Sequence, residues 1–205
     1  MGSVIVITSG KGGTGKTSLT GGVGASLALL GKQVLCLDGD VGLRNLDISL
    51  GMTDAALMDY SDVMAGRCDL SRAAVPHPTV SGLHLLTAPL TLPGDFPGEA
   101  GFQALLQQAR EAYDYVLIDS PAGLGPGFRL AVCGADRAIV VAVSDPSSLR
   151  DAQRVVTQLS QLETIHLVVN RVRPRLLRRQ NTTIDDAMDT AGLPLLGLVP
   201  GDPKV

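Results

Sequence analysis

Residues 4–17 read VIVITSGKGGTGKT, an apolar run that leads directly into a glycine-rich turn. Gly10, Gly15, Lys16 and Thr17 fit the phosphate-loop pattern G-x-x-x-x-G-K-[ST], in which glycines let backbone N–H groups point at phosphate oxygens. A strand-like run precedes the turn and a helical pattern follows it, which is the context that the motif requires. The loop residues that we expect to bind a nucleotide are Gly10, Lys11, Gly12, Gly13, Thr14, Gly15, Lys16, Thr17 and Ser18.

The chain alternates short apolar runs with segments of helical pattern, which predicts strands and helices in turn. Runs that are apolar throughout are typical of strands covered on both faces of a parallel sheet. We expect strands at 4–8, 34–38, 83–88, 115–119, 138–143, 166–170 and 193–199, and helices within 17–31, 57–66, 99–112, 151–163 and 182–192. The predicted fold class is α/β: a doubly wound, mostly parallel sheet of about seven strands with helices on both faces. We expect residues 1–205 to form a single P-loop domain.

The composition argues against several other classes of protein. With 17 basic and 20 acidic residues, the formal net charge of −3 gives no overall attraction to nucleic acid or anionic lipid. Cys36, Cys68 and Cys133 form no C-x-x-C pair, so neither a disulfide framework nor a zinc site is indicated, and Cys36 is expected to be a small buried apolar residue. The sequence shows neither a signal peptide nor an apolar run of about 18 residues, so we expect a cytoplasmic protein.

Polar residues follow five of the expected strands at their carboxyl ends, where parallel sheets bind their ligands. These residues are Ser9 and Gly10, Asp38 and Asp40, Asp119, Ser144 and Asp145, and Asn170 and Arg171. Five strand ends that meet at one crevice are stronger evidence for a binding site than any single motif.

ATP and Mg²⁺ are the ligands that this set of residues predicts. We expect Lys16 to reach the β- and γ-phosphate oxygens and the Thr17 hydroxyl to hold Mg²⁺. Asp38 and Asp119 end apolar strands, so we expect them in or near the coordination shell of the metal, and Asp40 is expected to orient the attacking water. The alternative for Asp38 and Asp40 is that they cap the helix that follows.

Lys11 is a second lysine, at the entrance of the loop and before the turn that surrounds the phosphates. This position is poorly suited to contact the nucleotide of the same chain. In a two-fold symmetric dimer its ammonium could reach the nucleotide of the other subunit, as an arginine finger does in other phosphoryl-transfer enzymes. The alternative is a solvated surface lysine. The residues that we expect to be catalytic are Lys11, Lys16 and Asp40.

The segment KGGTGKT (11–17) resembles the signature KGGxGKT of the ParA/MinD family of dimerising ATPases. Five more segments resemble the branch of that family that places the bacterial division septum: GLRNLD (42–47), DSPAG (119–123), PSSLRDAQR (146–154), LVVNRVRP (167–174) and LLGLVPGDPKV (195–205). The resemblance covers essentially the whole chain, although 90–101 matches weakly. It implies ATP hydrolysis to ADP and phosphate, a homodimer when ATP is bound, and a Lys11 that acts across the dimer.

The resemblance also implies contacts away from the phosphate loop. The residues that would bracket adenine are Asn170, Arg171, Pro200 and Asp202. The alternative for Asn170 is a polar cap on its strand. Ser148 to Asp151 would lie where a MinC-like regulator docks, and a MinE-like regulator is a second implied partner.

Members of this family usually continue past the final turn into a short basic amphipathic helix that lies in the membrane interface. The 205 residues include no such helix, so we expect the family's C-terminal membrane-targeting helix to be absent from this chain. For the full family architecture we expect reversible peripheral association with the inner face of the cell membrane.

The segment RVRPRLLRR (171–179) places five arginines within nine residues. It could be a solvated loop, a patch for DNA or acidic lipid that uses Arg175, Arg178 and Arg179, or a contact to the nucleotide or the dimer partner. We favour an ATP-dependent dimerising switch. The alternatives are a ParA-type DNA-segregation ATPase, a regulator of flagellar number, and an amide-forming synthetase or iron–sulfur reductase on the same fold. The acidic overall charge argues against nucleic acid as a partner, and the scattered cysteines argue against the reductase.

Overall fold

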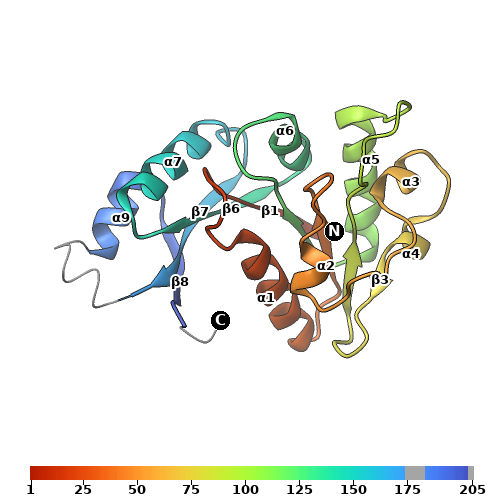
Figure 1. Ribbon diagram of the computed structural model, residues 1–205, viewed down its shortest axis with the longest axis horizontal. Helices are drawn as coiled ribbons and strands as arrows, with labels where there is room; N and C mark the ends of the chain where they lie inside the picture. Colours follow the sequence, from red (N-terminus) through yellow and green to blue (C-terminus); the bar gives the residue numbers. More distant parts are fainter. Residues whose placement is uncertain (174–182, 203–205) are drawn as a thin grey trace.

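The computed structural model describes residues 1–173 and 183–202, which form one eight-stranded sheet with helices on both faces (Figure 1). The strands are β1 (Ser3–Thr8), β2 (Val34–Asp38), β3 (Val75–Pro76), β4 (Leu83–Leu86), β5 (Tyr115–Asp119), β6 (Arg137–Val143), β7 (Thr164–Val172) and β8 (Leu195–Pro200). The helices are α1 (Lys16–Leu29), α2 (Leu46–Ser49), α3 (Tyr60–Met64), α4 (Leu70–Ala73), α5 (Gly98–Ala112), α6 (Pro126–Val132), α7 (Pro146–Thr157) and α9 (Ile184–Ala191).

The strand order is β3-β4-β2-β5-β1-β6-β7-β8, and every pairing except that of β3 with β4 is parallel. The prediction of an α/β fold with a mostly parallel sheet is confirmed, and all seven expected strands are present. The eighth strand, β3, was not predicted. It is an antiparallel edge strand of two residues that includes Pro76, and such a segment has no periodicity to detect.

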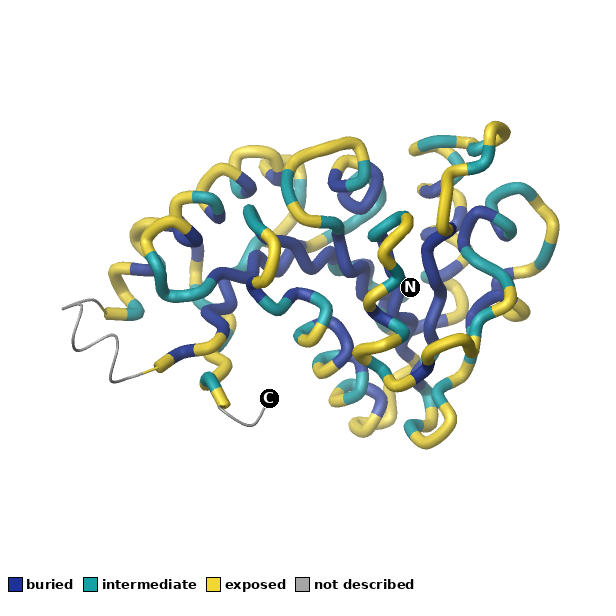
Figure 2. The backbone as a smooth tube through the Cα atoms, in the orientation of Figure 1, coloured by how far each residue is buried: buried dark blue, intermediate teal, exposed yellow. Residues whose placement is uncertain are grey.

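Two apolar clusters pack against the two faces of the sheet, and strand β2 contributes to both. Leu35 and Leu37 belong to the cluster that includes α5, α6, α7 and α9, whereas Val34 and Cys36 belong to the cluster that includes α1 and α2. Figure 2 shows the sheet as the buried centre of the molecule. Cys36 is fully buried, as predicted, and burial raises the pKa of its thiol to about 12.

The helices agree with the expected patterns except at four places. The helix that we expect within 151–163 is wrong at its start, because α7 begins at Pro146, and it ends inside the expected range at Thr157. Asp145 caps α7 by accepting a hydrogen bond from the Ser148 N–H at 3.0 Å, and proline suits the first turn of a helix. Helices α2, α4 and α6 were not predicted. They have four to seven residues each, which is too short for a helical period to show.

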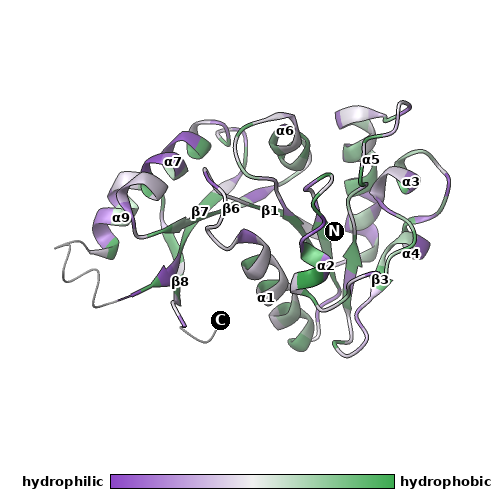
Figure 3. Ribbon diagram, in the orientation of Figure 1, coloured by the Kyte–Doolittle hydropathy of each residue, from purple (hydrophilic) through white to green (hydrophobic). Residues whose placement is uncertain are grey.

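Helices α7 and α9, which pack on the β6–β8 half of the sheet, carry stretches coloured as hydrophilic in Figure 3. Within the described residues, no helix combines the length and the apolar character needed to cross a bilayer. The loop over 90–97 precedes α5 and lies mostly at the surface.

A partly buried ion pair joins the amino-terminal edge of the sheet to helix α5. Arg110 donates to Asp136 at 2.8 Å and to the Gly134 carbonyl at 2.9 Å, and Asp136 accepts the Val4 N–H at 2.9 Å. Burial raises the pKa of Asp136, but the hydrogen bonds from Arg110 and Val4 outweigh it and hold the pKa below its ordinary value. The pair therefore ties the start of β1 to α5 and to the start of β6.

The substitution Asp136→Asn should lower the free energy of unfolding at pH 7 by about 1–3 kcal/mol, because it removes the charge that pairs with Arg110. An acid with a lowered folded-state pKa stabilises the fold above its unfolded pKa of about 3.9 and loses that contribution as the pH falls. Chemical denaturation at pH 7 and pH 4 should show that the parent and the variant differ less in free energy of unfolding at pH 4 than at pH 7. Asp189→Asn, an exposed change on α9, serves as a control, and an Asp136→Asn effect that is equal at both pH values would contradict the assignment.

Candidate functional site

The phosphate loop runs from the end of β1 to the start of α1 and leaves the first turn of α1 open. Gly13 and Gly15 have φ values of +75° and +92°, which only glycine adopts without strain. Among the described residues, no side chain caps α1 through a hydrogen bond, and its first turn carries no acidic residue. A Cβ atom at Gly12 or Gly13 would meet open space. The free N–H groups of this turn and the open space above them suit an anion.

Lys16 and Asp119 are buried charges at the centre of the site. Lys16 is 8% exposed, and burial lowers the pKa of its ammonium, while Asp119 and Asp40 attract it. The pKa of Asp119 is raised to about 7, chiefly by burial and also by the neighbouring Asp38, against the opposing effects of a hydrogen bond from Thr17 and the charge of Lys16. The structure thus places the predicted residues Lys16, Thr17, Asp38, Asp40 and Asp119 together at the carboxyl ends of β1, β2 and β5.

Asp38 holds the loop that follows β2. Its two carboxylate oxygens accept the N–H groups of Asp40 at 2.9 Å and Leu46 at 3.0 Å, and the side chain is buried. Burial raises the pKa of Asp38, which these two hydrogen bonds partly offset. Within the same loop Arg44 has a φ of +46° and donates to the Ala88 carbonyl. The metal role that we expect for Asp38 stays a prediction, and its position in the structure gives it a second task as an anchor of residues 40–46.

The oxygen donors of the site fit Mg²⁺ that arrives with a nucleotide. Thr17 and Asp119 offer a hydroxyl and a carboxylate, the hard donors that Mg²⁺ prefers. In the described part of the chain, no group of three or more His, Cys, Asp or Glu residues is arranged to hold a metal by itself. Mg²⁺ usually takes one or two carboxylates and fills its remaining positions with water and phosphate oxygens, so this sparse donor set is suitable.

Lys11 contacts helix α7. Its ammonium lies 3.1 Å and 3.2 Å from the two carboxylate oxygens of Asp145 and 3.0 Å from the Ser147 hydroxyl. Burial raises the pKa of Asp145, but hydrogen bonds from Ser147, the Ser148 N–H and Lys11 lower it below its ordinary value. The backbone of the loop also lies against α7, because a Cβ on Gly10 would be only 2.4 Å from the Asp151 carbonyl oxygen. The loop entrance therefore packs directly on α7.

The residues that the resemblance places around adenine also lie near one another. Asn170 and Arg171 are in β7, next to the end of β8, and the Gly201 N–H donates to the Val172 carbonyl at 3.0 Å. Pro200 ends β8 and is exposed, and Asp202 follows it at the surface. Their contact with a base stays a prediction. Of the arginine segment 171–179, residues 174–179 lie outside the described residues.

Two contributors to the site were not identified from the sequence. Thr20, one turn beyond Lys16, is fully buried and directs its hydroxyl at the Lys16 carbonyl and at Asp119. Asp145 was noted only as a strand-end residue, although its place before Pro146 is typical of a helix cap. Of the segment predicted to meet a regulator, Ser148 and Leu149 are buried, so Arg150 and Asp151 are the ones at the surface.

A phosphate loop between a buried strand and a helix, with acidic residues on the neighbouring strand ends, defines a P-loop nucleotide-binding protein. The model of the family described as CobQ/CobB/MinD/ParA nucleotide binding domain matches residues 5–205. The chain belongs to this family, whose MinD and ParA members are P-loop ATPases.

Comparison with individual proteins points to the MinD branch. The chain is 40% identical over 208 residues to the septum site-determining protein MinD of Synechocystis, an alignment that covers all of this chain and 78% of the relative. A chain of the MinC:MinD cell division protein complex of Aquifex aeolicus gives a TM-score of 0.90 at 38% identity, over 98% of this chain and 82% of that one. The septum site-determining protein MinD of Pyrococcus horikoshii, complexed with Mg-ADP, gives 0.83 at 30% identity, over 99% and 83%.

The substitution Asp119→Asn should stabilise the nucleotide-free protein and remove the Mg²⁺ dependence of ADP binding. An acid whose pKa is raised to about 7 in the folded state destabilises the fold when it ionises. The free energy of unfolding therefore falls as the pH rises from the pKa of the acid in the unfolded chain toward 7. Calorimetry should therefore show a larger increase in Tm at pH 8 than at pH 5. Asp189→Asn, an exposed change on α9, is the control. A Tm at pH 8 that is unchanged or lower would contradict the buried charge that we assign to Asp119.

Proposed function

We propose that this chain is an ATP-dependent, dimerising switch ATPase of the MinD type that hydrolyses ATP to ADP and phosphate and acts in division-site placement. The observation that carries the proposal is the position of Lys11. Its side chain is about one-third exposed, and its ammonium binds Asp145 and Ser147 at the start of α7, whereas Lys16 occupies the centre of the site. The whole-length similarity to septum site-determining MinD proteins supports the assignment.

The charges of the site support Mg-ATP as its ligand. Lys16 interacts with Asp119 and Asp40, and Asp38 lies near Asp119, so a triphosphate without a cation would meet net negative charge. Mg²⁺, when bound with the nucleotide, supplies positive charge that stabilises the phosphates in the transition state. Thr17 and Asp119 would hold the ion, and Lys16 would bind the β- and γ-phosphates. Asp40, which is partly exposed at the end of β2, would orient the attacking water.

Dimerisation would complete the site. A symmetric pair of chains that face each other across their phosphate loops would bring Lys11 of each subunit to the nucleotide of the other. To reach it, Lys11 must leave Asp145 and Ser147. The contact that holds it in the single chain therefore competes with the contact that the dimer needs. Hydrolysis would remove the γ-phosphate and release the pair.

The partners that we propose follow from the likeness to MinD proteins and from the exposed residues of α7. The Aquifex aeolicus neighbour was solved with MinC, so a MinC-like regulator is proposed to bind this chain, with Arg150 and Asp151 of α7 as its contacts. A MinE-like regulator and reversible attachment to the inner face of the membrane are proposed by the same likeness. The adenine contacts of Asn170, Arg171, Pro200 and Asp202 belong to this proposal as well.

The substitution Lys11→Ala should abolish ATP-dependent dimerisation and reduce turnover by roughly a thousand-fold, the lower range of what an arginine finger contributes. Light scattering with ATP or ADP should show the parent chain change from monomer to dimer with ATP alone. ADP binding to the monomer should persist in the variant, because Lys11 binds α7 in the single chain.

Lys32→Ala is the matched control, since Lys32 is an exposed lysine in the turn before β2. A monomeric Lys11→Ala protein that hydrolyses ATP at the parental rate would refute the proposed switch. Salt-sensitive retention of the ATP-bound parent on DNA would instead favour a segregation ATPase.

The substitution Asp145→Asn should lower the ATP concentration needed for half-maximal dimerisation by several-fold. A neutral amide attracts the Lys11 ammonium less than a carboxylate does, and asparagine still caps α7. The ATP titration, followed by light scattering, should be compared with that of Asp185→Asn, an exposed change on α9. An unchanged or higher midpoint would show that the pair of Lys11 and Asp145 does not restrain the single chain.

A further inference from the structure

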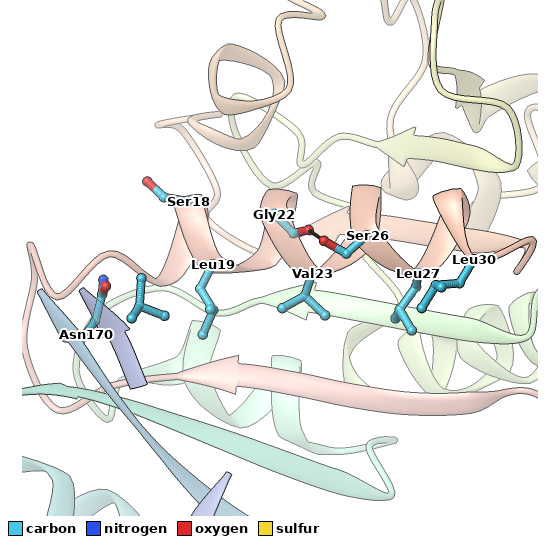
Figure 4. Close-up of a pocket in the computed structure, with 9 residues that line it drawn as sticks. Ser18, Leu19, Gly22, Val23, Ser26, Leu27, Leu30 and Asn170 are labelled. Atoms are coloured by element: carbon cyan, nitrogen blue, oxygen red, sulfur yellow. Dashed lines mark hydrogen bonds between the residues drawn. The ribbon is translucent and has the colours of Figure 1, made fainter. Parts of the chain in front are cut away.

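Asn170 lies in an irregular part of β7 that turns its side chain toward the phosphate loop. It pairs in register with Val143 of β6, and the pairing of β7 with β8 shifts between Val169 and Val172. Arg171 has a φ of +53°, an uncommon conformation for a residue with a side chain. The Asn170 side chain is only 8% exposed. Figure 4 shows it at the end of α1 that adjoins the phosphate loop, near the labelled Ser18 and Leu19.

Both ends of the Asn170 amide have partners. Its oxygen accepts the Arg171 N–H at 2.8 Å, which fixes the orientation of the amide plane. Its nitrogen donates to the Thr14 carbonyl at 2.7 Å, and Thr14 is 1% exposed. A strand of the β6–β8 half is thereby joined to the middle of the loop through one short, buried hydrogen bond.

This bond sets the direction of the next N–H group in the loop. In a trans peptide the C=O and the N–H point in opposite directions, so a Thr14 carbonyl held by Asn170 turns the Gly15 N–H away from Asn170. Gly15 also fits no side chain here, because a Cβ at this position would lie 2.2 Å from the Asn170 amide nitrogen. Position 15 must therefore be glycine for two reasons: the φ of +92° and the close approach of Asn170.

We propose that Asn170 is a positioning residue for the phosphates: it holds the Thr14–Gly15 peptide so that the Gly15 N–H is presented to the nucleotide's β-phosphate. The inference rests on the proposed nucleotide site and deepens it. Asn170 then acts through the loop and on any ligand with a diphosphate, whatever its base. The amide nitrogen keeps one free N–H and the amide oxygen keeps one free lone pair, which remain for adenine. Contact with the base would therefore be an addition to this role.

The groove beside α1 shows why the two roles must be tested separately. A cavity of about 430 Å³ runs along α1 from Asn170 past Leu19, Val23 and Leu27 to Leu30 (Figure 4). Val199 of β8 also lines it. A base placed at its mouth would lie beside Asn170. A loss of ADP affinity on its own would therefore not distinguish a reader of the base from a support of the loop.

The test measures the affinity of the parent, Asn170→Ala and Asn170→Asp for ADP, GDP and inorganic pyrophosphate, each with Mg²⁺, by calorimetry. The proposal expects Asn170→Ala to weaken all three by a similar factor of roughly ten, the loss expected for one buried hydrogen bond. The ratio of ADP to GDP affinity should not change. Asn170→Asp, which keeps the shape but loses the donor, should weaken pyrophosphate at least as much. Gln107→Ala, an exposed change on α5, is the matched control.

Three results would overturn the proposal. Pyrophosphate affinity that is unchanged in both variants, together with a lost preference for ADP over GDP, would make Asn170 a reader of the base and leave the proposed function intact. A Gly15 amide resonance that shifts on pyrophosphate binding equally in the parent and in Asn170→Asp would also refute the loop role, even if Asn170→Ala does not fold. A parent chain that binds neither pyrophosphate nor nucleotide would refute the nucleotide site itself.

Discussion

The buried attraction between Lys16 and the carboxylates of Asp119 and Asp40 is the interaction on which the site depends. Lys16 begins α1, Asp119 ends β5 and Asp40 follows β2, so three elements distant in sequence share one set of charges. Their burial raises the pKa of the acids and lowers that of the lysine, which shows that the fold holds these groups at a cost in solvation. Because these charges are poorly solvated, a nucleotide and a cation that bind together stabilise the site more than either ligand alone would.

The strand order brings the charged and polar residues of the site to one edge of the sheet. Because β2, β5, β1, β6 and β7 are adjacent and parallel, their carboxyl ends meet, and each contributes a polar residue at the point where it leaves the core. The β2–β5 half supplies the acids that face the phosphates. The β6–β7 half supplies Asp145, which holds Lys11, and Asn170, which holds Thr14. The phosphate loop lies between the halves and is fixed from both sides.

The sequence was sufficient for the fold and for the residues whose chemistry is local. Seven apolar runs predicted seven strands, and the glycine-rich motif located the loop because its requirements lie within eight residues. It was not sufficient where tertiary contacts decide. Strand β3 exists only because it pairs with β4, and α7 begins five residues earlier than its apolar period because Asp145 caps it. The partners of Lys11 and Asn170 are equally long-range, at separations of 134 and 156 residues, and no spacing in the sequence indicates them.

The close approach of α7 to Gly10 gives a different meaning to the first glycine of the motif. A side chain at this position would collide with the backbone of Asp151, so the residue is small because a helix crosses the loop there. Its neighbours Gly13 and Gly15 are small for the conformation of the loop itself. One sequence pattern therefore records two unrelated steric demands. A phosphate loop transplanted to a scaffold without such a crossing helix would need its last glycines, and could dispense with its first.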